Sequence, residues 1–212
     1  MQKETPKPYL ELAGKTILEY TIRRFLSLDG LRQVLVATSE SYLSTAKQIL
    51  EDVVPQNVAT KCIVGGQERQ DSIYNALDEV SDVDLVMVHD AVRPFVKPQH
   101  IKACCKVASE IGGAVLGVPA KDTIKRINEQ QVIQETPSRK FLWQTQTPQV
   151  FRKKLMLEAY EKARKEGFTG TDDSSLVERM GHQVKMVEGD RSNFKITYPL
   201  DLQLAELIIK KQ

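Results

Sequence analysis

One acid and one arginine stand three residues apart after a strongly apolar segment, in the run V-H-D-A-V-R-P over residues 88–94. Ligands of open α/β sheets bind beyond the carboxyl ends of strands, so Asp90 and Arg93 occupy positions where function is expected. A single carboxylate suits Mg²⁺, which takes its other oxygens from water and substrate phosphates, and arginine offers a planar fork to phosphate. In an isolated D-x-x-R the acid most often caps a turn and the arginine is a surface charge. Here the motif follows the most apolar predicted strand, which modestly favours a functional role over this structural one. His89 is more readily a structural histidine than a base or ligand.

A second candidate is the run G-G-Q-E-R-Q-D-S over residues 65–72, between a predicted strand and a predicted helix. Paired glycines permit close backbone approach and positive φ, and the amides of a helix N-terminus can bind an acceptor or anion. A plain tight turn is the commoner cause of a Gly-Gly pair, so this signal is weak alone.

Cationic and hydroxyl side chains recur at other loop-like positions. Each taken singly is most simply a solvated residue or a helix cap, and Thr171 before two acids is a good N-cap candidate. A site assembled from these types would handle phosphate, and the sequence has neither a Ser-His-Asp or Cys-His nucleophile pattern nor zinc-ligand spacing. The positions are Lys7, Thr123, Arg139, Thr147, Thr171 and Lys195.

Short apolar runs alternate with longer helix-periodic segments, which predicts a single α/β domain with a mostly parallel sheet flanked by helices. The polar stretch 120–147 lacks a sustained core face and is predicted to be an arm that packs on a partner. Strands are expected at 33–38, 60–64, 84–89, 113–118, 183–187 and 193–196. Helices are expected at 16–28, 42–52, 69–80, 98–111, 152–166, 172–180 and 199–210.

Composition excludes several classes of protein. The 212 residues are 41% hydrophobic, enough for one substantial core, and 30 Lys plus Arg against 28 Asp plus Glu leave a net charge of +2. This balance does not indicate a nucleic-acid partner. Three cysteines, two of them adjacent, do not form a disulfide framework. No signal peptide or membrane-spanning run is present, so we expect a cytoplasmic protein without membrane or nucleic-acid partners.

Seven segments, in this order, resemble the 2-C-methyl-D-erythritol 4-phosphate cytidylyltransferase family, and they span almost the whole chain. The combination of H-D-A-x-R-P, W-x-x-x-T-P-Q and T-D-D is far more specific than any one of them. The segments are T-P-K-P-Y-L (5–10), G-G-Q-E-R-Q-D-S (65–72), V-H-D-A-V-R-P (88–94), P-A-K-D-T-I-K-R (119–126), L-W-Q-T-Q-T-P-Q-V-F (142–151), T-G-T-D-D (169–173) and N-F-K-I-T-Y-P-L-D-L (193–202).

The resemblance implies a Rossmann-like nucleotidyltransferase core and a homodimer whose extended arms exchange. It implies CTP and a sugar-alcohol phosphate as substrates and a divalent cation, Mg²⁺, held by Asp90. By motif, Lys7 would contact the CTP phosphates, Lys195 would lie beside the α-phosphate, and Gly66 and Ser72 would lie against cytosine. Gln67 stands where relatives often carry an acid. Arg93, Thr123 and Thr171 would line the sugar-phosphate pocket, while Arg139 and Thr147 would reach the partner's substrate.

The chemistry suits these residue types. A phosphate monoester is largely a dianion at neutral pH, since its second pKa is about 6, so the nucleophile needs no general base. It needs relief from repulsion between two polyanions, which metal and cationic side chains supply, and alignment with the α-phosphorus.

One expectation concerns the segment that precedes T-P-K in the family, a strand and a Gly-rich loop of the A-A-G-x-G-x-R kind. It has no counterpart here, so we expect a fragment or a misplaced start, unpaired neighbouring strand edges, and poor or no activity as written. Other readings stay open at this point: a ribitol 5-phosphate cytidylyltransferase, a non-catalytic nucleotide-binding dimeric scaffold, or in principle a uridylyl- or guanylyltransferase.

Overall fold

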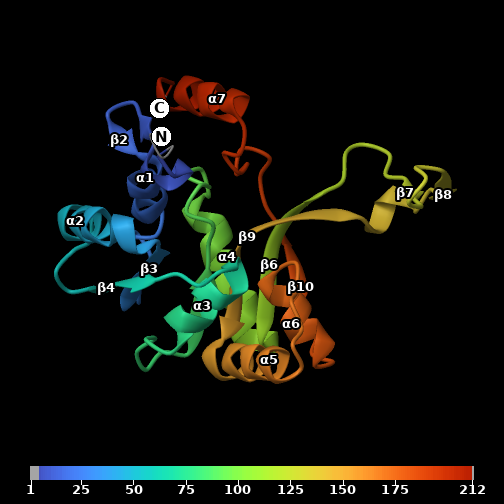
Figure 1. Cartoon of the computed structure of the whole chain (residues 1–212), viewed down its shortest axis with the longest axis horizontal. Helices are drawn as coiled ribbons and strands as arrows, with labels where there is room; N and C mark the ends of the chain where they lie inside the picture. The colour runs from blue at the N-terminus through green and yellow to red at the C-terminus, as the bar shows by residue number, and fades with distance from the viewer. Residues whose placement is uncertain (1–4, 212) are drawn as a thin grey trace.

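The chain folds around a four-stranded mixed sheet with strand order β10-β6-β9-β5 (Figure 1). The computed structural model describes residues 5–211. Strands β10 and β6 are parallel, whereas β9 runs antiparallel to both β6 and β5. The predicted α/β class is therefore confirmed, with a mixed sheet. The four strands are β5 (Leu85–Val88), β6 (Gly113–Pro119), β9 (Trp143–Arg152) and β10 (Lys185–Glu188).

Two further pairs of strands and the helices complete the molecule. The helices are α1 (Ile17–Arg23), α2 (Leu43–Val53), α3 (Arg69–Leu77), α4 (Pro98–Ile111), α5 (Lys153–Lys165), α6 (Asp173–Arg179) and α7 (Pro199–Ile209), with short 3-10 turns η1 (Lys7–Tyr9), η2 (Glu40–Tyr42) and η3 (Arg139–Phe141). The remaining strands are β1 (Glu11–Leu12), β2 (Lys15–Thr16), β3 (Gln33–Thr38), β4 (Ala59–Val64), β7 (Arg126–Ile127) and β8 (Ile133–Glu135).

Helices cover both faces of the four-stranded sheet, and β6 shows why. Successive side chains of a strand point to opposite faces, so Ala114 and Leu116 pack with α4 while Val115 packs with α5 and α6. All three residues are at most 1% exposed. The resulting three layers fix the carboxyl end of β5, where Asp90 follows.

A separate parallel pair, β3 and β4, lies beside this sheet and carries α1 and α2 (Figure 1). Ala46 and Leu50 of α2 pack with Val36 of β3 in one apolar cluster. Within residues 5–211, β3 and β5 each pair with a single strand.

The polar excursion between β6 and β9 protrudes from the body (Figure 1). Its antiparallel strands β7 and β8 pair only with each other. The end of the predicted arm, residues 143–147, instead belongs to β9 and pairs with β6. Polar residues open β9, in the run W-Q-T-Q-T, so its sequence does not show the apolar pattern of a buried strand.

A small apolar cluster lies under the candidate site. Val92 and Phe95 flank Arg93, and they pack with Ile196, which follows Lys195. The predicted strand at 193–196 is wrong: this segment is a loop, whose amide at Ile196 donates to Val92 O at 2.9 Å. Its alternating pattern comes from one-sided burial against this cluster, not from a sheet.

None of the helices within residues 5–211 is long and apolar enough to cross a membrane.

We predict that Ile196→Ala destabilises the fold by about 2–5 kcal/mol, because this side chain is 2% exposed and its removal leaves a cavity. Urea unfolding followed by circular dichroism measures the change. The matched control is Leu207→Ala on α7, where the side chain is 58% exposed and the cost should stay within about 0.5 kcal/mol. Equal costs at the two positions would contradict the role given to this cluster.

Candidate active site

Asp90 follows the end of β5 and is surrounded by three cations. Its Oδ2 lies 3.1 Å from Arg93 Nε and 3.4 Å from Lys195 Nζ, and its Oδ1 lies 3.7 Å from Arg69 Nε. The side chain of Asp90 is only 13% exposed. The structure therefore brings together three predicted site residues, Asp90, Arg93 and Lys195, from two distant parts of the chain. Arg69 was not predicted as a site residue.

The charge state of Asp90 follows from this geometry. Burial alone raises the pKa of a carboxyl, but Lys195, Arg93 and Arg69 outweigh it and hold the pKa of Asp90 below its ordinary value. Asp90 is thus an anion at neutral pH, available as an oxygen ligand.

The backbone at Asp90 is fixed by a hydroxyl of β9. The amide of Asp90 donates to Thr147 Oγ1 at 3.0 Å, and this oxygen lies 3.1 Å from His89 Nδ1. His89 Nε2 lies 3.0 Å from Arg93 O, which can only accept. Burial lowers the pKa of His89 to about 4, so the ring is neutral, donates from Nε2 and accepts from Thr147 at Nδ1.

His89 is therefore structural, as expected. Thr147 is only 5% exposed. Its hydroxyl supports the Asp90 loop of its own chain, and the residue lies within β9, which pairs with β6. That Thr147 also reaches the substrate of a partner stays a prediction.

A buried asparagine ties Arg93 to the loop that carries Lys195. Arg93 NH1 donates to Asn193 O at 2.9 Å, and Asn193 Nδ2 donates to Thr147 O at 3.0 Å. Asn193 is 0% exposed. Sequence reasoning did not single out Asn193; its place two residues before Lys195 was the only available signal.

The glycine loop at 65–72 forms a turn that leads into the first residues of α3 and is held by hydrogen bonds within the loop. The amide of Gly66 donates to Ser72 Oγ at 3.0 Å, and Glu68 and Asp71 form a capping box. A Cβ at Gly66 would lie 2.2 Å from Asp71 Cβ, so no other residue fits there without movement. Gln67 is exposed at the turn. This arrangement joins the two residues predicted for cytosine, Gly66 and Ser72, with Gln67 at the same turn.

The loop at 169–173 lies against the glycine loop. Gln70 bridges the two, since its Nε2 donates to Phe168 O and its Oε1 accepts from Gly170 N, both at 2.9 Å. Residues of both loops, with Tyr160, line a cavity of about 190 Å³ that includes Thr171. The N-cap of α6 is Asp172, which accepts from Ser175 N at 3.0 Å, so the capping role expected for Thr171 is wrong by one residue.

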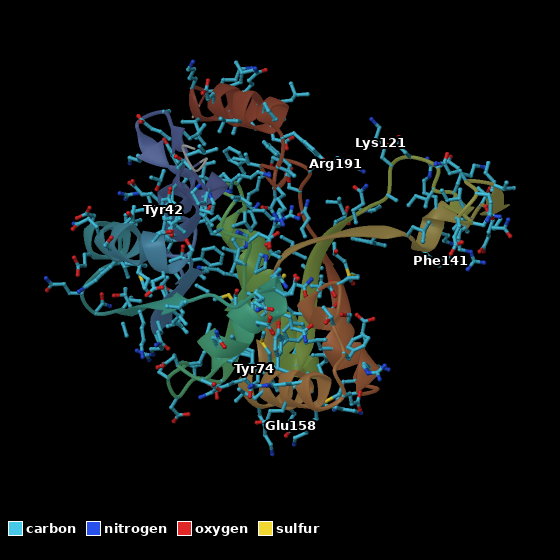
Figure 2. All side chains as sticks on the ribbon, in the orientation of Figure 1. Tyr42, Tyr74, Lys121, Phe141, Glu158 and Arg191 are labelled. Carbon is cyan, nitrogen blue, oxygen red and sulfur yellow. The ribbon has the colours of Figure 1, made fainter. Side chains whose placement is uncertain are left out.

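The remaining predicted residues lie outside the Asp90 cluster. Lys7 is exposed in η1, and the neighbouring Tyr9 donates to or accepts from Thr38 Oγ1 at 2.6 Å, at the carboxyl end of β3. Thr123 and Arg139 are exposed on the excursion, where Arg139 NH1 donates to Lys121 O at 2.5 Å. Figure 2 shows the excursion, with Lys121 near its root and Phe141 further out, projecting from the body.

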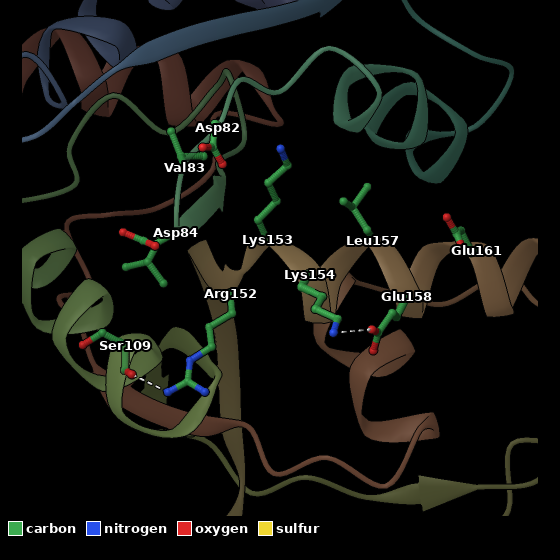
Figure 3. A pocket seen from close by; sticks show the side chains of 11 residues that line it. Asp82, Val83, Asp84, Ser109, Arg152, Lys153, Lys154, Leu157, Glu158 and Glu161 are labelled. Carbon is green, nitrogen blue, oxygen red and sulfur yellow. Dashed lines mark hydrogen bonds and ion pairs between the residues drawn. The ribbon is translucent and has the colours of Figure 1, made fainter.

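The larger cavity of the chain lies elsewhere (Figure 3). It measures about 720 Å³ and is lined by residues 82–85 at the amino end of β5, opposite Asp90, and by the start of α5. Its cations are already occupied: Arg152 donates to Ser109 O at 2.6 Å and Lys153 to Ser81 O at 2.9 Å. This cavity is not the candidate site.

A divalent cation fits the Asp90 end of the sheet. No group of three or more His, Cys, Asp or Glu residues within 5–211 could hold a metal alone. One anionic carboxylate beside phosphate-binding cations matches Mg²⁺, which is usually bound through one or two carboxylates and substrate phosphates. Asp90 is the residue that would hold it.

The fold and the cluster define an α/β protein with a group of cations around one carboxylate beyond the end of a strand. The family model of 2-C-methyl-D-erythritol 4-phosphate cytidylyltransferase matches residues 1–211. A protein of that name from Caldanaerobacter subterraneus is 44% identical over 212 residues, which cover 100% of this chain and 93% of the relative. One from Geotalea uraniireducens is 43% identical over 99% of this chain and 91% of the relative.

Solved structures agree with the sequence relatives. The 4-diphosphocytidyl-2C-methyl-D-erythritol synthase of Anaerococcus prevotii superposes with a TM-score of 0.89 at 29% identity, covering 97% of this chain and 90% of that one. The 2-C-methyl-D-erythritol 4-phosphate cytidylyltransferase of Thermus thermophilus gives 0.81 at 33% identity, covering 97% and 94%. The chain belongs to the 2-C-methyl-D-erythritol 4-phosphate cytidylyltransferase family.

We predict that Thr147→Val destabilises the chain by about 1–3 kcal/mol, because the amide of Asp90 and Nδ1 of His89 lose a buried partner. Valine keeps the shape, so the loss reports the hydroxyl. Chemical unfolding of both proteins gives the value. The control is Thr136→Val, where an exposed hydroxyl accepts from Lys125 Nζ at 2.8 Å and the change should be within about 0.5 kcal/mol. A neutral Thr147→Val would refute the supporting role.

Proposed function

We propose that this chain transfers CMP from CTP to 2-C-methyl-D-erythritol 4-phosphate and releases pyrophosphate. The observation that carries the proposal is the Asp90 cluster, in which three cations surround one anionic carboxylate beyond β5. Membership of a family of cytidylyltransferases supports the choice of reaction. An oxygen of the sugar phosphate attacks the α-phosphorus of CTP, and the bond from that phosphorus to the β-phosphate oxygen breaks.

The residues of the site suit this reaction because the nucleophile is already anionic. No proton must be removed from a phosphate dianion, so a neutral, internally bonded His89 is no obstacle. Burial raises the pKa of Cys62, Cys104 and Cys105, so these thiols are poor nucleophiles. All three cysteines are free, which supports a reducing compartment such as the cytoplasm.

Each substrate has a proposed set of contacts. Lys7 binds the CTP phosphates and stabilises the departing pyrophosphate, and Lys195 lies beside the α-phosphate. Backbone and hydroxyl groups of Gly66 and Ser72 read the edge of cytosine, with Gln67 at the same turn. The closed geometry of that loop supports this role, since it presents backbone next to a cavity.

The sugar phosphate is proposed to lie between Arg93 and the 169–173 loop. The guanidinium of Arg93 is held by Asp90 and by Asn193 O, so its donors are already oriented. Thr171 lines the cavity next to that loop. Thr123, on the excursion, is proposed to complete this set. When bound at Asp90, Mg²⁺ would neutralise charge on the phosphates.

We further propose a homodimer formed through the excursion at 120–147, with Arg139 reaching the substrate of the partner subunit. Five large apolar side chains of this excursion are exposed: Ile124 at 39%, Ile127 at 52%, Val132 at 56%, Ile133 at 57% and Phe141 at 77%. Such a group on a segment that projects from the body is typical of an interaction site.

We predict that Phe141→Asp shifts the protein from dimer to monomer, because a charge at the most exposed of these positions cannot be buried cheaply. Light scattering coupled to size-exclusion chromatography measures the mass. Leu204→Asp is the control, since it also charges an exposed apolar residue, 46% exposed, but on α7. A monomeric wild type, or a dimer that survives Phe141→Asp and dissociates with Leu204→Asp, would overturn the proposal.

The activity test is pyrophosphate release with CTP, Mg²⁺ and either 2-C-methyl-D-erythritol 4-phosphate or ribitol 5-phosphate. We expect turnover with the first substrate and a loss on the order of 100-fold in Asp90→Asn, which keeps the shape but removes the charge. Asp29→Asn should match the wild type, because Asp29 is 97% exposed and pairs only loosely with Lys102. Preference for ribitol 5-phosphate would redirect the substrate, and no turnover with either would refute the proposed function.

A further inference from the structure

Arg69 is the third cation on Asp90, and it differs from Arg93 and Lys195 in having a second, fixed partner. Its NH1 and NH2 donate to the two carboxylate oxygens of Asp173, at 3.2 and 2.7 Å. This fork-to-carboxylate geometry restrains the plane of the guanidinium as well as its position. The remaining donor, Nε, faces Asp90 Oδ1 at 3.7 Å.

Asp173 is a rigid anchor for that arginine. Its side chain is 0% exposed, so its charge requires compensation inside the protein. The hydroxyl of Tyr160, itself 2% exposed, donates to Asp173 Oδ1. Burial and the neighbouring Asp173 raise the pKa of Tyr160, so it remains a proton donor. Asp173 thus has two partners: Tyr160, which is fixed by packing, and Arg69, whose 41% exposed side chain is restrained by its two bonds to Asp173.

The anchor joins three segments that form the candidate site. Arg69 is the first residue of α3, directly after the glycine loop at 65–72. Asp173 is the first residue of α6, directly after the loop at 169–172, and Asp90 follows β5. Arg69 and Tyr160 also line the cavity between the two loops, so the guanidinium lies between the proposed nucleotide loop and the proposed sugar-phosphate loop.

We propose that Arg69 is a positioning residue, which orients Asp90 for the divalent cation and couples the glycine loop to the 169–173 loop, with Asp173 and Tyr160 as its anchor. This inference rests on the proposed function for its effect on turnover. Its effect on the two loops does not depend on that function.

The test compares Arg69→Lys with the wild type. Lysine keeps the charge but cannot hold Asp173 with a planar fork while facing Asp90. We expect kcat/KM for the sugar phosphate to fall about 10- to 100-fold and the Mg²⁺ concentration for half-maximal rate to rise about 10-fold, as is typical when a partner of a metal ligand is lost. Tyr160→Phe should shift both quantities in the same direction by less, because only one donor to Asp173 is removed.

Hydrogen exchange of the full chain, read by mass spectrometry, supplies a readout that does not require turnover. In Arg69→Lys the segments 65–72 and 169–173 should both exchange faster, because one side chain restrains both. The matched control is Arg23→Lys, which alters an arginine that donates to Glu19 from Nε and NH2 on the exposed face of α1. It should leave the rate, the Mg²⁺ requirement and both segments as in the wild type.

The outcomes separate the two proposals. If the wild type turns over and Arg69→Lys keeps its kinetics, or if either loop keeps its exchange rate, the inference is overturned while the proposed function stands. If Arg69→Lys only melts at a lower temperature, with unchanged kcat/KM and Mg²⁺ requirement, the arginine is merely structural and the inference also fails. If the wild type shows no turnover, the proposed function fails and the exchange of the two loops alone decides the role of Arg69.

Discussion

The compensation of charge at Asp90 is the constraint on which the site depends. A carboxylate that is 13% exposed is costly unless cations approach it, and three do so within 3.7 Å. These cations cannot come from one segment, because a single turn or helix face does not surround an acid. The fold therefore brings the start of α3 and the loop at 193–197 to the end of β5. The apolar cluster of Val92, Phe95 and Ile196 holds two of these segments together.

This arrangement leaves the site positively charged. Arg69, Arg93 and Lys195 against the carboxylates of Asp90 and Asp173 give an excess of one positive charge in a chain whose net charge is only +2. A local excess of this kind attracts phosphate groups without a basic surface elsewhere. The composition of the whole chain therefore hides the electrostatic character of its site: a balanced count of charges does not indicate a nucleic-acid partner and still allows a site for a phosphorylated small molecule.

The sequence predicted those parts of the molecule whose signals are local. The α/β class followed from alternating apolar runs, and Asp90 with Arg93 followed from the most apolar strand. Lys195 was one of several cations at loop-like positions, and only the family resemblance assigned it a role beside the α-phosphate. Strand β9 was missed since its first residues are polar, and the loop at 193–196 was taken for a strand because its alternation imitates one. Thr147 could not be placed, as its partner Asp90 lies 57 residues away.

The pair of Arg69 and Asp173 is another long-range contact that the sequence does not predict. Each sits in a motif that was recognised, but the motif gives no reason to join them across 104 residues. The pairing with Asp173 also distinguishes Arg69 from Arg93 and Lys195, the other two cations near Asp90. The two side chains are similarly exposed, Lys195 at 46% and Arg69 at 41%, so the difference lies in their partners. Lys195 pairs with Asp90 through a flexible ammonium, whereas Arg69 is held by two bonds to the buried Asp173. In the proposed mechanism, in which Asp90 exchanges cationic partners for a metal, this restraint on Arg69 keeps one neighbour of the carboxylate oriented.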